Sequence, residues 1–86
     1  MNIALVRWRD SMRETGWRSV DDATKHIYQS DYLDCESVGF VVGETSDRLM
    51  LALNHQHIEG SEETVGETIV IPKAAIFERH ELIRKP

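Results

Sequence analysis

The middle of the chain alternates apolar and polar residues, and this rhythm constrains the fold more than any other feature of the sequence. Apolar residues recur at every second position on both sides of a short polar turn, namely Val38, Phe40 and Val42 before it and Leu49, Leu51 and Leu53 after it. A period of two is typical of strands, so residues 36–43 and 48–54 are predicted to form a β-hairpin around a turn at 44–47. The opposite face of the second strand carries Met50 and Ala52, which predicts that the helix described below or another subunit covers it.

Three further strands are expected. Residues 3–8 combine strand-forming side chains with alternating arginines, and a second strand at 67–71 follows a long polar loop at 54–66. Pro72 ends that strand because proline has no N–H to donate to a ladder. A single 3-10 turn at 72–75 and a last strand at 74–83 are predicted next, although the composition of this segment also permits a helix.

One short helix is predicted at 20–29. Ser19 precedes it as an N-cap, and Asp22 three residues later completes an arrangement close to a capping box. The residues at helical spacing on one face are Val20, Ala23, Thr24, Ile27 and Tyr28. A helix of this length is marginal without packing.

The chain is short enough to be a single domain over residues 1–86, and a domain of this size retains little net stability. Its only cysteine is Cys35, which excludes an internal disulfide and a cysteine-based zinc site. Small domains often gain stability from disulfides, a structural metal or self-association, and self-association is the remaining source of extra stability here. No apolar stretch approaches the roughly 20 residues of a membrane span, and no secretory signal is recognisable, so a cytoplasmic location is expected.

The net charge of −5 disfavours binding to duplex DNA, which draws affinity from basic surfaces. The positive charges gather near the two ends of the chain, at Arg7, Arg9, Arg13, Arg18, Arg79, Arg84 and Lys85. If the two ends meet in the fold, they form a local positive patch.

Aromatic residues beside arginines are the main candidates for ligand binding. They are Arg7 and Arg9, which flank Trp8, and the pair Trp17 and Arg18. Such residues can stack on bases or nucleotides. The alternative, which we favour, is that both tryptophans anchor the core while their charged neighbours reach solvent.

A second candidate is a metal site at His55, His57 and Glu59, because alternating histidines with a nearby carboxylate are potential ligands. The alternative is an exposed polar loop. No phosphate-binding loop or hydrolase motif is present, so we expect neither an enzyme nor a cofactor.

The order of elements resembles Sm-like proteins. The segment SVGFVVGETSDRLMLALNHQ is similar to the first motif of that family, and IVIPKAAIFERHEL is similar to its second half and to the end of SH3-type barrels. Arginine-glycine or lysine-histidine signatures of RNA-contacting loops are absent, so the resemblance does not imply RNA binding. The whole chain also resembles small uncharacterised bacteriophage and prophage proteins through two short motifs, carried here by Val6, Trp8, Asp10, Ile71, Pro72, Lys73 and Ile76.

The sequence therefore predicts a mainly β fold with one short helix (α+β), arranged as strand, helix, β-hairpin and two strands in a strongly bent Sm-like or SH3-like barrel. We expect a non-enzymatic phage or prophage accessory protein in the bacterial cytoplasm. It would act by protein–protein contact as a homo-oligomer joined through edge strands, with a host protein as a possible partner. The alternatives are an oligomer that binds a nucleotide or single-stranded nucleic acid at subunit boundaries, and a metal-binding protein.

Overall fold

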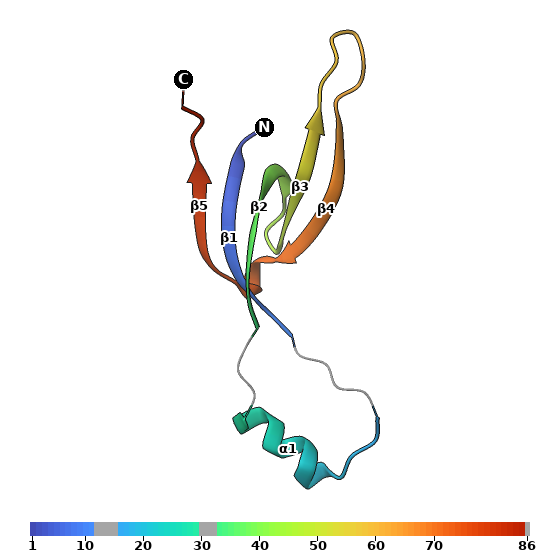
Figure 1. Cartoon of the computed structure of the whole chain (residues 1–86), viewed down its shortest axis with the longest axis vertical. Coiled ribbons are helices and arrows are strands. Elements are labelled where there is room, and N and C mark those ends of the chain that lie inside the picture. The colour runs from blue at the N-terminus through green and yellow to red at the C-terminus, as the bar shows by residue number, and fades with distance from the viewer. Residues whose placement is uncertain (12–15, 30–32, 86) are drawn as a thin grey trace.

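The computed structural model describes residues 1–11, 16–29 and 33–85, which form a five-stranded antiparallel sheet, one short α-helix and one 3-10 turn (Figure 1). The elements are β1 (Ile3–Asp10), α1 (Val20–Gln29), β2 (Leu33–Glu44), β3 (Arg48–Gln56), β4 (Thr64–Pro72), the 3-10 turn η1 (Lys73–Ala75) and β5 (Ile76–Leu82). Their order in the sheet is β4-β3-β2-β1-β5, which leaves β4 and β5 as the edges. The prediction of a mainly β chain with one short helix is confirmed.

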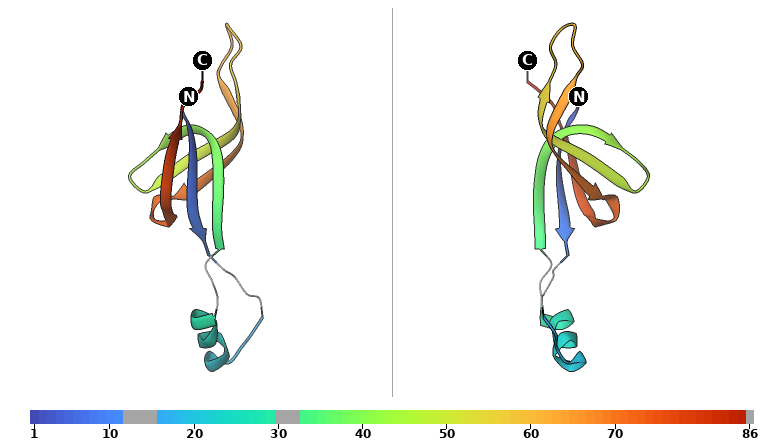
Figure 2. Two further views of the ribbon diagram at one scale, coloured as in Figure 1. Left: turned by 60° about the vertical axis from the view of Figure 1, so that its left-hand side comes forward. Right: turned by 90° about the vertical axis from the view of Figure 1, so that its right-hand side faces the viewer.

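The core joins strands that are not neighbours in the sheet. The buried apolar residues of the described chain are Ala4, Val6, Leu49, Leu51, Ala52 and Ile71. Val6 on β1 belongs to the same cluster as Leu51 on β3 and Ile71 on β4, although β2 lies between β1 and β3. The sheet must therefore curl back on itself, as the two views of Figure 2 show.

The predicted faces of the hairpin are correct for part of β3 and wrong for β2. Leu49 and Leu51 are buried as expected. On β2, however, Val41 packs against the core instead of Val38, Phe40 and Val42. The register with β3 shifts between Val41 and Gly43, and this irregularity breaks the simple alternation.

Leu53 is also misassigned, because its side chain is 66% exposed instead of buried. Ala52 pairs with Thr68 and Asn54 pairs with Gly66, but Glu67 between them has a φ of 56°. A positive φ is unusual for glutamate and distorts the ladder at this point. The face that Leu49 and Leu51 share therefore does not continue to Leu53.

Gly39 allows β2 and β3 to approach closely. A Cβ built on this residue would lie 2.7 Å from the carbonyl oxygen of Ala52. Only glycine fits here without moving the backbone, so this position explains why a strand otherwise rich in large residues contains a glycine.

The long polar loop predicted at 54–66 is shorter than expected, since β3 extends to Gln56 and β4 begins at Thr64. His55 pairs with Val65 and Gln56 pairs with Thr64. Backbone hydrogen bonding, which does not require apolar side chains, extends the hairpin into this polar sequence. The connecting segment is residues 57–63.

Residues 16–29, named the arm here, lie beyond the ends of β1 and β2 (Figure 1). Ser19 is the predicted N-cap, and its Oγ accepts a hydrogen bond from the Asp22 N–H at 3.1 Å. The arm is connected to the sheet at the last residue pair of the β1–β2 ladder, in which Asp10 on β1 lies opposite Leu33 on β2.

The arm does not cover the sheet, so the prediction that the helix covers the second face of the hairpin is wrong for this chain by itself. Val20 and Ile27 are 81% and 76% exposed. The side chain of Tyr28, predicted on the same face, and the whole of Arg13 lie outside the described residues. Within the described ranges, no helix has the length and apolar character needed to cross a membrane.

Candidate functional site

The outer side of β1 and β5 carries an aromatic ring between two arginines. The guanidinium carbons of Arg7 and Arg9 lie 5.2 and 5.0 Å from the centre of the Phe77 ring, within the range of a cation–π contact. Arg7 and Arg9 were predicted as ligand-binding residues, whereas Phe77 was assigned only to a strand. The sequence could have indicated Phe77 only if the pairing of β1 with β5 had been known.

Carboxylates partly neutralise these arginines. Arg7 Nη1 lies 3.8 Å from Glu78 Oε1, and Arg9 Nε lies 3.4 Å from Asp34 Oδ1. The pairing of β1 with β5 brings the two ends of the chain together as expected. Because acidic side chains from β2 and β5 share this surface, its charge is mixed.

Trp17 and Arg18 are not part of this cluster. They precede α1 in the arm, which Figure 1 places beyond the lower ends of the strands. The Trp17 side chain is fully exposed, so the interpretation of Trp17 as a core anchor is wrong. The local cue of a tryptophan after a glycine could not reveal that the arm projects from the sheet.

Trp8, in contrast, is an anchor. It packs against the core cluster, and its Nε1–H donates a hydrogen bond to Ser37 Oγ at 3.1 Å. The apolar body of the indole is thus partly buried and its polar group is satisfied, as is usual for tryptophan in a protein interior.

The histidine candidates lie at the far end of the β3–β4 hairpin. His55 Nε2 is 3.4 Å from Glu63 Oε1, and the His55 ring contacts Phe40 edge-on at 5.4 Å. His57 and Glu59 belong to the connecting segment. Across residues 1–11, 16–29 and 33–85, no group of three or more His, Cys, Asp or Glu side chains could hold a metal.

Glu44 organises an ion-pair cluster that the sequence did not reveal. Its Oε2 accepts a hydrogen bond from Arg79 Nη2 at 2.9 Å, and its Oε1 accepts one from Lys73 Nζ at 2.8 Å. Arg79 Nε also donates to Glu81 at 2.7 Å. The hydrogen bonds from Arg79 and then from Lys73 lower the pKa of Glu44 to about 2, and the same contact raises the pKa of Arg79.

This cluster links one end of β2 to η1 and to β5, which is separated from β2 in the sheet by β1. The backbone N–H of Lys73 also donates to the carbonyl oxygen of Asp47 in the β2–β3 turn at 2.9 Å. These contacts hold the curled sheet together at one end. We therefore assign the Glu44 cluster a structural role.

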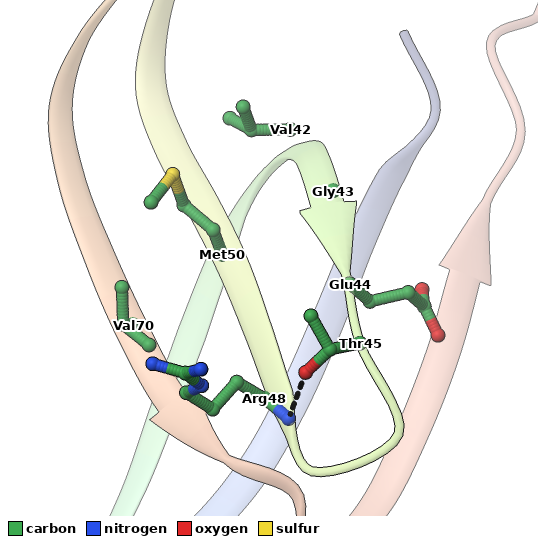
Figure 3. Close-up of a pocket in the computed structure, with 7 residues that line it drawn as sticks. All are labelled: Val42, Gly43, Glu44, Thr45, Arg48, Met50 and Val70. Atoms are coloured by element: carbon green, nitrogen blue, oxygen red, sulfur yellow. Dashed lines mark hydrogen bonds between the residues drawn. The ribbon is translucent and has the colours of Figure 1, made fainter.

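An apolar groove lies beside the cluster, on β2, β3 and β4 (Figure 3). Its volume is about 310 Å³, and the apolar side chains that line it are Val42, Met50 and Val70. Glu44, Thr45 and Arg48 lie along its border, and the Thr45 hydroxyl accepts a hydrogen bond from the Arg48 N–H at 3.1 Å. Figure 3 shows Met50 and Val70 side by side above Arg48.

Comparisons of the chain with protein-family models, curated proteins and solved structures found no match.

Proposed function

We propose that this protein is a non-enzymatic binding protein that acts by protein–protein contact as a homo-oligomer. The observation that carries the proposal is the edge strand β4. In the sheet that the described residues form, its backbone is hydrogen-bonded only to β3, and Ile69 and Val70 on it are 39% and 49% exposed. Exposed apolar edges with few charges are templates for pairing with another strand.

The two edges of the sheet differ in a way that favours head-to-tail pairing. Within β4, Glu67 is the one charged residue and Pro72 stands at the end, whereas β5 carries the consecutive polar residues 78–81. Like-with-like pairing of β5 would place equal charges together, which is unfavourable. Pairing β4 of one copy with β5 of the next is heterologous and produces a ring when the rotation closes.

The finer description of the fold belongs to the same proposal. The core contacts between β1 and β4 and the Glu44 cluster support a strongly bent barrel of the Sm-like or SH3-like type. The assignment to phage or prophage accessory proteins of the bacterial cytoplasm rests on the sequence resemblance alone. A host protein is then the expected partner of the oligomer.

Native mass spectrometry of the purified protein tests this proposal. We expect wild type to be oligomeric and Ile69→Lys to shift it towards monomer, because a charged side chain on β4 opposes edge pairing. Leu53→Lys is the matched control, since it places the same charge on an exposed residue of the interior strand β3. If the wild-type protein remains monomeric at every concentration, this result alone contradicts the proposal.

A second candidate function is binding of a nucleotide or single-stranded nucleic acid, and the arginine–Phe77 cluster favours it. An exposed ring with adjacent guanidinium groups can stack on a base while the charges meet phosphate. Fluorescence anisotropy with a labelled oligothymidine should then show binding that weakens in Phe77→Ala and Arg7→Ala. Arg48→Ala removes an exposed arginine elsewhere on the sheet and should bind like wild type. Equal binding of the oligonucleotide by all variants would reject the arginine–Phe77 cluster as the binding site.

A further inference from the structure

The arm exposes three large apolar side chains within eleven residues. Trp17 is fully exposed, and Val20 and Ile27 follow it on α1. Tryptophan is normally highly buried in soluble proteins. An isolated helix of ten residues is also marginal in water, so α1 needs a surface to pack against.

Among the described residues the arm extends away from the sheet, and this extension is reflected in the radius of gyration. It is 17.7 Å, against roughly 12 Å for a compact chain of this length. The views of Figure 2 show the arm extended along the long axis of the molecule, with the sheet at the other end.

The groove on β2, β3 and β4 matches the arm in polarity and size. At about 310 Å³ it can receive one large aromatic side chain, and its lining is almost entirely apolar. Met50 offers a thioether, which makes favourable contacts with aromatic rings. Arg48 at the border offers a guanidinium for the face of an indole.

The charges next to each surface are also complementary. Asp21 and Asp22 lie in the first turn of α1, four and five residues after Trp17. Arg48 on the groove is largely exposed and contacts the carboxylate of its neighbour Asp47 at 3.6 Å. Asp22 already contacts Lys25 at 3.8 Å within α1, so Asp21 is the acidic side chain that the arm offers to Arg48 when Trp17 occupies the groove.

We propose that the arm of one copy docks in this groove on a second copy, with Trp17 as the anchor. One chain carries both the apolar arm and the apolar groove, so two copies can exchange arms and satisfy both surfaces in a closed, two-fold contact. This inference rests on the proposed self-association, but its anchor Trp17 and the groove residues Val42 and Met50 lie outside the β4 edge, and Val70 alone belongs to both surfaces. It names Trp17 and the groove as a contact surface between subunits.

Tryptophan fluorescence provides a direct test, because the chain has only two tryptophans. In Trp8→Phe, Trp17 is the single reporter. We expect its emission to shift to shorter wavelength, and its quenching by acrylamide to fall, as the protein concentration rises. An emission typical of water at all concentrations would overturn the proposal, and a buried Trp17 at all dilutions would show docking within one chain instead.

Mixing variants tests the partner surface. Trp17→Ala lacks the anchor, and Met50→Glu places a charge in the groove on the interior strand β3, away from the β4 edge, so each is expected to raise the dissociation constant of the dimer by roughly tenfold or more. An equimolar mixture restores one complete contact and should associate more tightly than either variant alone. Two variants that each associate like wild type, or a mixture that gains nothing over its components, would contradict the exchange.

The outcomes also separate this inference from the edge-strand proposal. If only the arm contact exists, Ile69→Lys leaves the dimer intact and Trp17 buried. If only edge pairing exists, the oligomer is sensitive to Ile69→Lys while Trp17 remains exposed. Ile69→Lys and Trp17→Ala change partly and fully exposed side chains, and circular dichroism checks that each variant keeps its strand content.

Discussion

The sheet buries a core of apolar side chains, whereas the arm exposes large apolar side chains to solvent. The sheet places Leu49, Leu51 and Ile71 out of contact with water. The arm, although its helix is well capped by Ser19, leaves Trp17 and Ile27 in solvent. The difference shows that local sequence signals are enough to form a helix but do not supply its partner.

The largest effect that tests this contrast is a core truncation. Leu51→Ala removes a buried side chain and is expected to lower the free energy of unfolding by about 2–5 kcal/mol. Ile27→Ala, at an exposed position of the arm, should leave the unfolding free energy of dilute protein within about 0.5 kcal/mol of wild type. Urea unfolding gives the free energy of unfolding of both variants. An Ile27→Ala variant that lost as much stability as Leu51→Ala would contradict the difference between sheet and arm.

A smaller effect is expected at the close approach of β2 and β3. Gly39→Ala adds a Cβ 2.7 Å from the Ala52 carbonyl oxygen and should destabilise the sheet by about 1–3 kcal/mol, because the backbone must move. Gly43→Ala is the matched control, since a Cβ there meets nothing within 4 Å. Thermal unfolding compares the two, and equal midpoints would mean that the sheet is looser at Gly39 than its geometry indicates.

The smallest effect concerns acid. The pKa of Glu44 falls from its ordinary 4.5 to about 2 in the folded chain, so the carboxylate stabilises the fold above pH 4.5 and this contribution is lost as the pH falls towards 2. Glu44→Gln should weaken that part of the acid dependence, measured as unfolding midpoints between pH 2 and 6. Glu59→Gln, in the segment between β3 and β4, is the control. Identical profiles for wild type and Glu44→Gln would rule out a stabilising role for the cluster.

The sequence predicted which elements form, and their order, better than it predicted which side chains face the core. Alternation and capping located the β2–β3 hairpin and α1 because both depend on neighbouring residues. The irregularity after Val41 and the positive φ of Glu67 shift the faces of the strands, and both are details of strand pairing that a period of two does not encode. The alternation therefore misplaced Leu53.

The candidate sites also differ in whether they depend on neighbouring residues or on contacts between distant segments. Arg7 and Arg9 were identified because they alternate around Trp8, a local pattern. Phe77 and the Glu44 cluster depend on contacts between segments at least 29 positions apart, which a single sequence does not reveal. Trp17 was predicted to be buried because it follows the loop residue Gly16, and this local cue says nothing about the direction in which the arm leaves the sheet.

The arm is attached where Asp10 faces Leu33, a single rung of the β1–β2 ladder. A chain that departs and returns at one rung can vary in length and content while the hydrogen bonds on either side stay in place. The sheet is therefore independent of the segment that joins residues 10 and 33, and a longer or shorter segment there would leave the strand order β4-β3-β2-β1-β5 unchanged.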